Sequence, residues 1–307
     1  MQHEQYLHGI QQEIGKRLVG RNDTIELLWI SILAKGHVLL DDLPGTGKSE
    51  LAKLLATVLG AEFGRVQGTS DVTPSDVTGF YYYNQQTTTF DFRKGPIFNS
   101  VLLFDEINRA SPRAQAGLLE AMAERQVTID GHTMPLPETF FVLATQNPVD
   151  QNQGTFALPH AQLDRFLMKL SLEELSEDHK RDILRQSRQP EEPVKAVLTL
   201  AELQKLQEEV TRVSVSEEID TYLLAILASL KEQEETAHDV GPRAALALLR
   251  AAQARAAVHG RSYVLPEDVF LLAEHVLAHR IQLQGRLTSN QKDVVERAKN
   301  SVPITIN

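Results

Sequence analysis

The sequence predicts an α/β fold, with a mostly parallel sheet between helices, followed by a second domain made only of helices. Three observations support this fold class. Short apolar runs typical of buried strands alternate with amphipathic helical patterns in the first half of the chain. The strand-like runs stop after about residue 170. Five amphipathic segments then follow one another as far as residue 281.

The expected elements follow from local signals. Strands are predicted at HVLL, AEFGRVQ, VLLFDE and TFFVLATQN. Helices are predicted at residues 48–59 and 112–125, and Ser111 is a natural N-cap for the second. Two hairpins are expected, one turning at residues 84–86 and one at the Asp-Gly pair of residues 130–131. We predict a first domain over residues 1–170 and a helical domain over 171–307 with a linker near 186–198, whereas the tail from residue 285 shows no clear pattern.

Composition excludes several classes of function. The 307 residues carry a formal net charge of −10, which disfavours nucleic acid as a partner. Cysteine is absent, so neither a disulfide nor a thiolate metal site can form. No apolar run approaches the ~20 residues of a membrane span, and the N-terminal stretch with Glu4 and Glu13 is unlike a signal peptide. We therefore expect a cytoplasmic protein without membrane insertion.

The stretch DDLPGTGKS matches a phosphate-binding loop except at its first position, where Asp42 replaces glycine. Aspartate tolerates the left-handed backbone that this position favours better than most residues do. Backbone N–H groups at the glycines approach phosphate oxygens, Lys48 neutralises their charge, and Ser49 binds Mg²⁺. The candidate nucleotide-binding residues of this loop are Gly45, Thr46, Gly47, Lys48, Ser49 and Glu50.

Two further strands end in polar residues suited to ATP hydrolysis. After VLLF, Asp105 is expected to hold Mg²⁺ together with Ser49, partly through water, and Glu106 to polarise the attacking water. After FFVLATQ, the amide of Asn147 is expected to orient that water. Taken alone, the acidic pair could be a solvated turn and Asn147 a simple chain reversal. Their order after a phosphate loop favours the catalytic interpretation.

Two arginines complete the candidate site. Arg165 in HAQLDRF is expected to stabilise phosphoryl charge across a subunit boundary, and the simpler alternative is a surface ion pair with Asp164. Arg243 opens a helix of the second domain and is expected to reach the γ-phosphate. Its simpler alternative is an ordinary exposed arginine.

The motifs LLDDLPGTGKS, DEINRASPRAQAGLLEAMAERQVTI, FFVLATQNP, LPHAQLDRF and GRSYVLPEDV resemble those of AAA+ ATPases, and more narrowly of the MoxR family, over about residues 18–281. The resemblance implies an AAA+ core of strand order 5-1-4-3-2 with β-hairpin insertions, and a helical lid. It also implies ATP and Mg²⁺ bound between the subunits of a hexameric ring, with Val19 and Gly20 near the adenine. The chain reads VGPRA around Arg243 where relatives commonly read SPRA.

The family resemblance further implies chaperone-like work on a protein client, in remodelling, maturation or metal-cofactor insertion, beside partners with von Willebrand factor A domains. A helicase or DNA-remodelling AAA+ motor is the alternative enzyme, and the acidic charge argues against it. A non-catalytic module of the same fold is disfavoured by the joint presence of Glu106, Asn147 and Arg165. A GTPase is disfavoured because NQKD has the wrong order for a guanine-reading motif.

A pair of histidines and a cluster of aromatic residues each have two possible interpretations. His275 and His279 share one helix face, which permits metal binding but is more typical of packed histidines. The aromatic residues of 81–83, with Phe90 and Phe92, fit either cross-strand pairing or contact with a substrate or partner.

Overall fold

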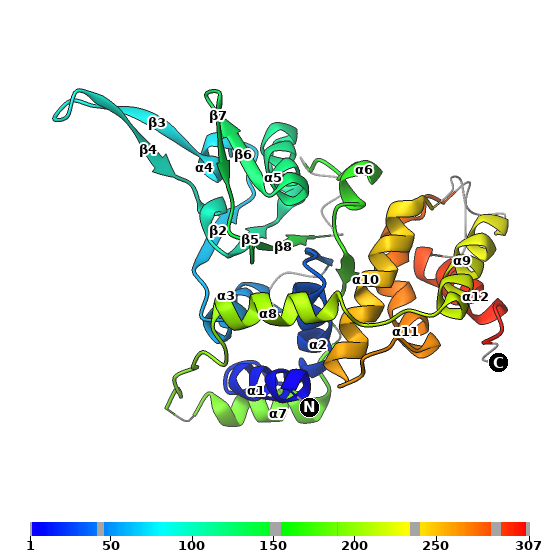
Figure 1. The fold of residues 1–307 in the computed structure, drawn as a ribbon. Helices are drawn as coiled ribbons and strands as arrows, with labels where there is room; N and C mark the ends of the chain where they lie inside the picture. The colour runs from blue at the N-terminus through cyan, green and yellow to red at the C-terminus, as the bar shows by residue number, and fades with distance from the viewer. Residues whose placement is uncertain are drawn as a thin grey trace.

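The fold is described from a computed structural model, which covers residues 2–41, 46–147, 155–172, 174–188, 190–233, 240–283 and 290–304. Its centre is a parallel sheet of five strands, which lie in the order β2-β5-β8-β1-β9 (Figure 1). The strands are β1 (Val38–Asp41), β2 (Phe63–Gln67), β5 (Val101–Asp105), β8 (Phe141–Gln146) and β9 (Met168–Leu170). Numbered along the chain as core strands, this order is 5-1-4-3-2, so the predicted sheet is confirmed.

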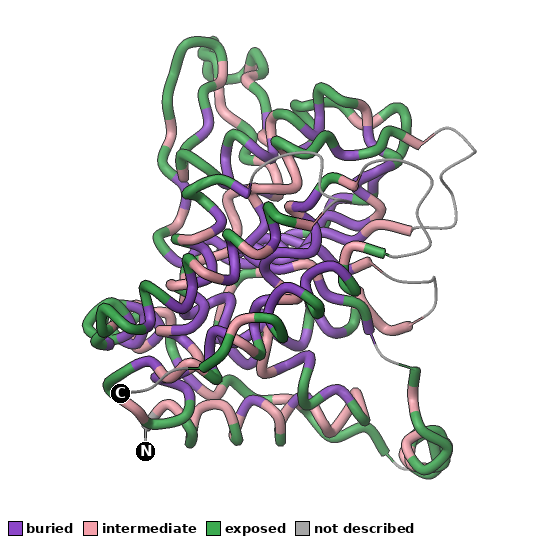
Figure 2. Tube along the Cα trace, turned by 90° about the vertical axis from the view of Figure 1, so that its right-hand side faces the viewer, coloured by how far each residue is buried: buried purple, intermediate pink, exposed green. Residues whose placement is uncertain are grey.

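Helices cover both faces of the sheet, which explains why its strands are continuous apolar runs. On β1, Val38 and Leu40 pack into one apolar cluster with helices α2 and α3, whereas Leu39 packs into another with α5. Figure 2 shows the buried segments gathered around the sheet. The helical elements of this half are α1 (Gln2–Gly15), α2 (Asn22–Leu33), α3 (Lys48–Val58), α4 (Pro74–Thr78), η1 (Pro96–Phe98), η2 (Ile107–Arg109), α5 (Pro112–Glu124) and α6 (His160–Leu163).

The two predicted hairpins are present as β3 (Gly79–Asn84) with β4 (Thr89–Lys94), and β6 (Gln126–Ile129) with β7 (His132–Pro135). Asp130 and Gly131 both have positive φ, at 49° and 80°, as a two-residue type I′ turn requires. The hairpin β3–β4 extends away from the sheet (Figure 1). Its aromatic rings pair across the strands, with 5.0 Å between the centroids of Tyr81 and Phe92 and 5.5 Å between those of Tyr83 and Phe90.

The second half is helical, as predicted. Its elements are α7 (Glu177–Gln186), α8 (Leu200–Val210), α9 (Glu217–Glu232), α10 (Pro242–Val258), α11 (Pro266–Leu277), η4 (Ala278–Arg280) and α12 (Gln291–Ser301). Helix α12 lies in the tail that showed no pattern in the sequence. Its signal is the N-cap Asn290, whose side chain accepts a hydrogen bond of 3.0 Å from the Asp293 N–H.

The helical half packs directly on the α/β half. In α8, Gln207 donates a hydrogen bond of 2.7 Å to the carbonyl of Ile32, and α10 also contacts α2. One apolar cluster runs from α2 and α3 into α10 and α11. Near the expected linker, the Val197 N–H donates to the carbonyl of Val58 at 2.7 Å. A domain boundary at residue 170 therefore stays a prediction. No helix among the described residues is long and apolar enough to cross a membrane.

Candidate functional site

The carboxyl ends of β1, β5 and β8 meet at one edge of the sheet, because parallel strands end on the same side. A cavity of about 200 Å³ opens there. It is lined by Thr46, Gly47, Lys48, Ser49, Glu50, Asp105, Glu106 and Asn147. The structure thus brings together residues predicted from three separate strand ends. Gly45 and Asp42 lie outside the described residues.

Gly47 turns the chain from the loop into α3. Its φ of 87° is left-handed, which glycine adopts without strain, and it directly precedes the helix at Lys48. The first turn of α3 therefore presents its N–H groups to the cavity, the arrangement that binds phosphate. A Cβ placed on Gly47 would lie 3.0 Å from Cδ1 of Leu18, so the segment holding Val19 and Gly20 runs beside the phosphate loop.

Asp105 is held in the cavity by three hydrogen bonds to its carboxylate. Its Oδ1 accepts a hydrogen bond of 2.7 Å from Thr145 Oγ1, and its Oδ2 accepts bonds from Ser49 Oγ at 3.2 Å and from Arg65 at 2.8 Å. The residue is 9% exposed. A serine hydroxyl and a carboxylate oxygen that converge in this way are the hard oxygen ligands that Mg²⁺ prefers. The described residues therefore fit the predicted cation.

Glu106 directly follows β5 and has a left-handed backbone conformation, with φ of 53° and ψ of 51°. This conformation costs about 1–2 kcal/mol in a residue that is not glycine. Its N–H donates to Thr145 Oγ1 at 2.8 Å instead of continuing the sheet, and Arg109 pairs with its carboxylate at 3.0 Å. The strained turn directs the chain out of the strand at the rim of the cavity, as functional sites often require.

Gly68 directly follows the neighbouring strand β2, and its backbone packs against the turn at Glu106. Its N–H donates to the carbonyl of Asp105 at 2.6 Å. A Cβ at Gly68 would lie 2.2 Å from the backbone oxygen of Glu106, a distance that no side chain can accept. Asn108 in η2 donates to the carbonyl of Asn147 at 3.3 Å, which joins η2 to the residue that follows β8.

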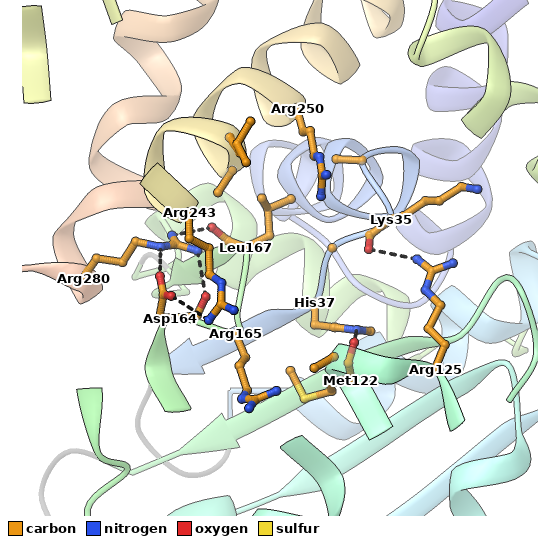
Figure 3. Close-up of a pocket in the computed structure, with 15 residues that line it drawn as sticks. Lys35, His37, Met122, Arg125, Asp164, Arg165, Leu167, Arg243, Arg250 and Arg280 are labelled. Atoms are coloured by element: carbon orange, nitrogen blue, oxygen red, sulfur yellow. Dashed lines mark hydrogen bonds and ion pairs between the residues drawn. The ribbon is translucent and has the colours of Figure 1, made fainter. Parts of the chain in front are cut away.

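Arg165 and Arg243 lie elsewhere. Neither lines the cavity of the phosphate loop as the described residues define it. Both line a separate cleft of about 490 Å³ (Figure 3). There Arg165 donates to the carbonyl of Leu119 at 2.9 Å, and Arg243 pairs with Asp164 at 3.1 Å. Asp164 also pairs with the buried Arg280 at 2.9 Å, so its described partners are two lid arginines rather than its neighbour in sequence.

The two histidines of α11 and η4 are packed. His279 is 1% exposed, and its Nε2 lies 3.0 Å from the carbonyl oxygen of Phe166. Burial lowers the pKa of both His275 and His279 below the usual histidine value. No group of three metal-ligating side chains occurs within the described ranges.

Sequence reasoning missed four residues of these sites. Thr145 and Arg65 bond to Asp105, Gly68 packs against Glu106, and Arg280 holds Asp164. Thr145 lies near the end of β8, two positions before Asn147, so the alternation of side chains along the strand was a usable signal. The other three depend on contacts between separate elements.

A phosphate loop at the end of β1, an acidic pair at the end of β5 and an amide after β8 in this strand order define an ATPase of the AAA type. Comparison with known families agrees. Residues 37–168 match the family described as "ATPase family associated with various cellular activities (AAA)", and residues 229–298 match the AAA lid domain.

Individual relatives narrow the family. An uncharacterised Bacillus subtilis protein, YeaC, is 44% identical and covers 89% of this chain and 85% of its own length. Chaperone MoxR1 of Mycobacterium tuberculosis is 36% identical over 88% and 74% of the two chains. A solved structure of a candidate ATPase from Cytophaga hutchinsonii has a TM-score of 0.91 at 34% identity, covering 99% of this chain and 96% of that one.

The chain belongs to the MoxR family of AAA+ ATPases. It binds nucleotide and hydrolyses ATP. The predicted fold class, family and enzyme activity are therefore confirmed.

Proposed function

We propose that this protein works as a ring, hexameric as the family resemblance implies, in which each ATP is hydrolysed between two subunits. The observation that carries the proposal is the position of Arg165. It lines a cleft apart from the cavity that holds Lys48, Asp105 and Glu106. Phosphoryl transfer spreads negative charge over oxygens that face away from the phosphate loop, and an arginine from an adjacent subunit can meet that charge.

Within one subunit, the geometry supports a role for each residue of the cavity. Lys48 and the N-terminus of α3 bind the phosphates, and Ser49 with Asp105 would hold Mg²⁺, which neutralises phosphate charge when bound. Glu106 at the rim activates the attacking water, and Asn147 orients it. The nearby backbone of residues 18–20 contacts the adenine. Thr145 orients Asp105 and Glu106 through hydrogen bonds to the Asp105 carboxylate and the Glu106 N–H.

Arg243 belongs to the same interface in this proposal. It pairs with Asp164 and lines the same cleft as Arg165, whereas the described lining of the cavity that holds Lys48 does not include it. Both arginines would then face the nucleotide of the adjacent subunit, with Arg243 directed at its γ-phosphate. Arg243 would still contact nucleotide as predicted, but the nucleotide would be bound by the neighbouring subunit.

We further propose that ATP hydrolysis remodels a protein client in the cytoplasm, in maturation or metal-cofactor insertion, together with a partner that carries a von Willebrand factor A domain. A relative named as a chaperone supports this proposal over a helicase. The exposed aromatic residues near the tip of β3–β4, Tyr83 at 53% and Phe90 at 70%, offer a contact surface for such a client. Purification from the native host with ATP elution would identify the client.

The decisive experiment mixes two inactive variants, Arg165→Ala and Glu106→Gln. In a mixed ring, some interfaces pair an intact Glu106 with an intact Arg165 from the adjacent subunit, so ATPase activity returns in part. Arginines of this kind contribute roughly 10³–10⁵ in rate, which makes the recovery easy to measure. If the variants assemble together and recover no activity at any ratio, Arg165 does not act between subunits. A dilute monomer with full activity would rule out the ring.

A further inference from the structure

The cleft that holds Arg165 is strongly cationic. Its charged lining consists of Lys35, Arg125, Arg165, Arg243, Arg250 and Arg280, opposed by the single carboxylate of Asp164. This concentration of positive charge is unexpected in a chain of net charge −10. In Figure 3, Arg243, Arg280 and Asp164 lie together at one end of the cleft, and Lys35 and Arg125 lie at the other, with Arg250 above. A cleft of about 490 Å³ has the size of a small-molecule site.

Separate parts of the fold supply this charge. Arg125 follows the last residue of α5 in a left-handed conformation, and two of its nitrogens donate to the backbone carbonyls of Glu138 and Lys35 at 3.1 and 3.3 Å. From the lid, α10 presents Arg243 and Arg250, which are seven positions apart and so share one helix face. The cleft therefore lies between the α/β half and the lid.

The charge at one end of the cleft is only partly compensated, by Glu138 near Arg125. Among the described residues, the side chains of Lys35 and Arg250 have neither a hydrogen-bond nor an ion-pair partner. Burial lowers the pKa of Arg125, and the charge of Arg250 lowers it further against the opposing effect of Glu138. Asp164 compensates Arg243 and Arg280 at the other end. Cations held close together in a partly enclosed space favour an anion between them.

We propose that the end of this cleft formed by Lys35, Arg125 and Arg250 is a second anion site, which binds a small, multiply charged oxyanion such as a chain of phosphoryl groups. Guanidinium groups bind phosphate oxygens in pairs of parallel hydrogen bonds. A bound anion would contact α5 and the loop before β1 on one side and α10 on the other, and would so fix the lid against the sheet. The inference does not depend on ring formation.

The same phosphoryl chemistry could come from nucleotide on an adjacent subunit, so the test removes nucleotide. Tripolyphosphate is titrated by calorimetry into the full chain carrying Lys48→Ala, without nucleotide and at several protein concentrations. We expect saturable binding of one anion per chain, with an affinity that falls as salt increases and does not depend on protein concentration. No saturable binding, or binding only in assembled rings, would overturn the proposal.

Site specificity is tested by charge reversal in the same background. Arg250→Glu should weaken tripolyphosphate binding by at least about tenfold, since hydrogen bonds to charged groups are worth that much. Lys35→Ala should weaken it to a lesser extent. Arg188→Glu, which reverses an exposed charge outside the cleft, is the matched control and should leave the affinity unchanged. Equal losses in Arg250→Glu and Arg188→Glu, or no loss in Arg250→Glu with its fold intact by circular dichroism, would refute the site.

Discussion

Ser49 and Asp105 are 56 positions apart in the chain, yet Ser49 Oγ donates a hydrogen bond of 3.2 Å to Asp105 Oδ2. The contact joins the start of α3 to the end of β5 where Mg²⁺ is proposed to bind. We predict that Asp105→Asn weakens ATP binding in the presence of Mg²⁺ by at least about tenfold, because a charged ligand is lost. Binding in the presence of a chelator should change little. A fluorescent ATP analogue measures both affinities, and an equal loss under the two conditions would contradict a role in metal binding.

Glu106 and Lys48 should separate turnover from binding. Because Glu106 lies at the cavity rim and is proposed to activate water, Glu106→Gln should retain ATP affinity while the hydrolysis rate falls by ~10²–10⁴. Lys48→Ala should weaken binding itself. Phosphate release and nucleotide titration on both variants give the comparison. An unaltered rate in Glu106→Gln would move the water-activating role to another residue.

Thr145 should prove essential although it lies behind the cavity. It is 1% exposed, donates to Asp105 and accepts from the Glu106 N–H. Thr145→Val leaves both groups without this partner, so we expect a loss of about 1–3 kcal/mol in the free energy of unfolding and a lower hydrolysis rate. Thr145→Ser keeps the hydroxyl and is the control. Denaturant titration and steady-state ATPase assays test the pair, and equal behaviour of valine and serine would disprove the hydroxyl's role.

Arg280 and Arg243 both pair with Asp164 but should differ in their effect on stability. The Arg280 side chain is 4% exposed and that of Arg243 is 67% exposed. Arg280→Ala removes one partner of a largely buried pair and should cost about 3–5 kcal/mol. Arg243→Ala should cost less than about 1 kcal/mol, as exposed pairs do. Urea midpoints decide, and similar losses for the two variants would contradict this division.

The free energy of unfolding should decrease as the pH is lowered, because of His37. Its Nδ1 accepts a hydrogen bond from the Val142 N–H at 3.1 Å, and its Nε2 lies 3.3 Å from the carbonyl oxygen of Met122, which is the bonding of a neutral ring. Burial lowers its pKa to about 4. In the unfolded chain His37 therefore becomes protonated below about pH 6.5, whereas in the folded chain it stays neutral down to about pH 4. Stability should drop by about 2 kcal/mol between pH 7.5 and 5 from this residue alone.

The check is the urea midpoint of His37→Gln and of the unchanged chain across the same pH range. The variant should show a shallower pH dependence, whatever its stability at neutral pH. The buried His279, whose pKa is also lowered, remains in both proteins and contributes equally to both slopes. Parallel curves for the two proteins would show that His37 does not titrate as its burial implies.

The sequence predicted the sheet well because its signals are local. Four of the five core strands (β1, β2, β5 and β8) were predicted from short strand-like runs, and the Asp130-Gly131 turn depends on two adjacent residues. The strand β9 has only three residues and was not predicted from its local pattern. Helix α12 was missed because its apolar positions are few, and only its cap at Asn290 marks it clearly. The domain boundary near residue 170 stays a prediction, because α8 and α10 bury apolar faces against α2 as well as against each other.

The cavity was also predictable in large part, since Lys48, Ser49, Asp105 and Asn147 belong to motifs with fixed spacing. The contacts that support it were not. Arg65 reaches Asp105 only because β2 lies beside β5 in the sheet, and Arg280 is 116 positions from Asp164. The placement of Arg243 depends on how the lid packs. No spacing along the chain encodes that packing.

The close approach of Gly68 to Glu106 has a mechanical consequence. From Gly68 the chain passes through α4 into the hairpin β3–β4, whose Tyr81 ring lies 5.6 Å from that of His132 in the second hairpin. Because there is no room for a Cβ at Gly68, we expect a displacement at Glu106 to be transmitted to this segment. The aromatic tip of β3–β4 would then respond to events at the proposed water-activating residue.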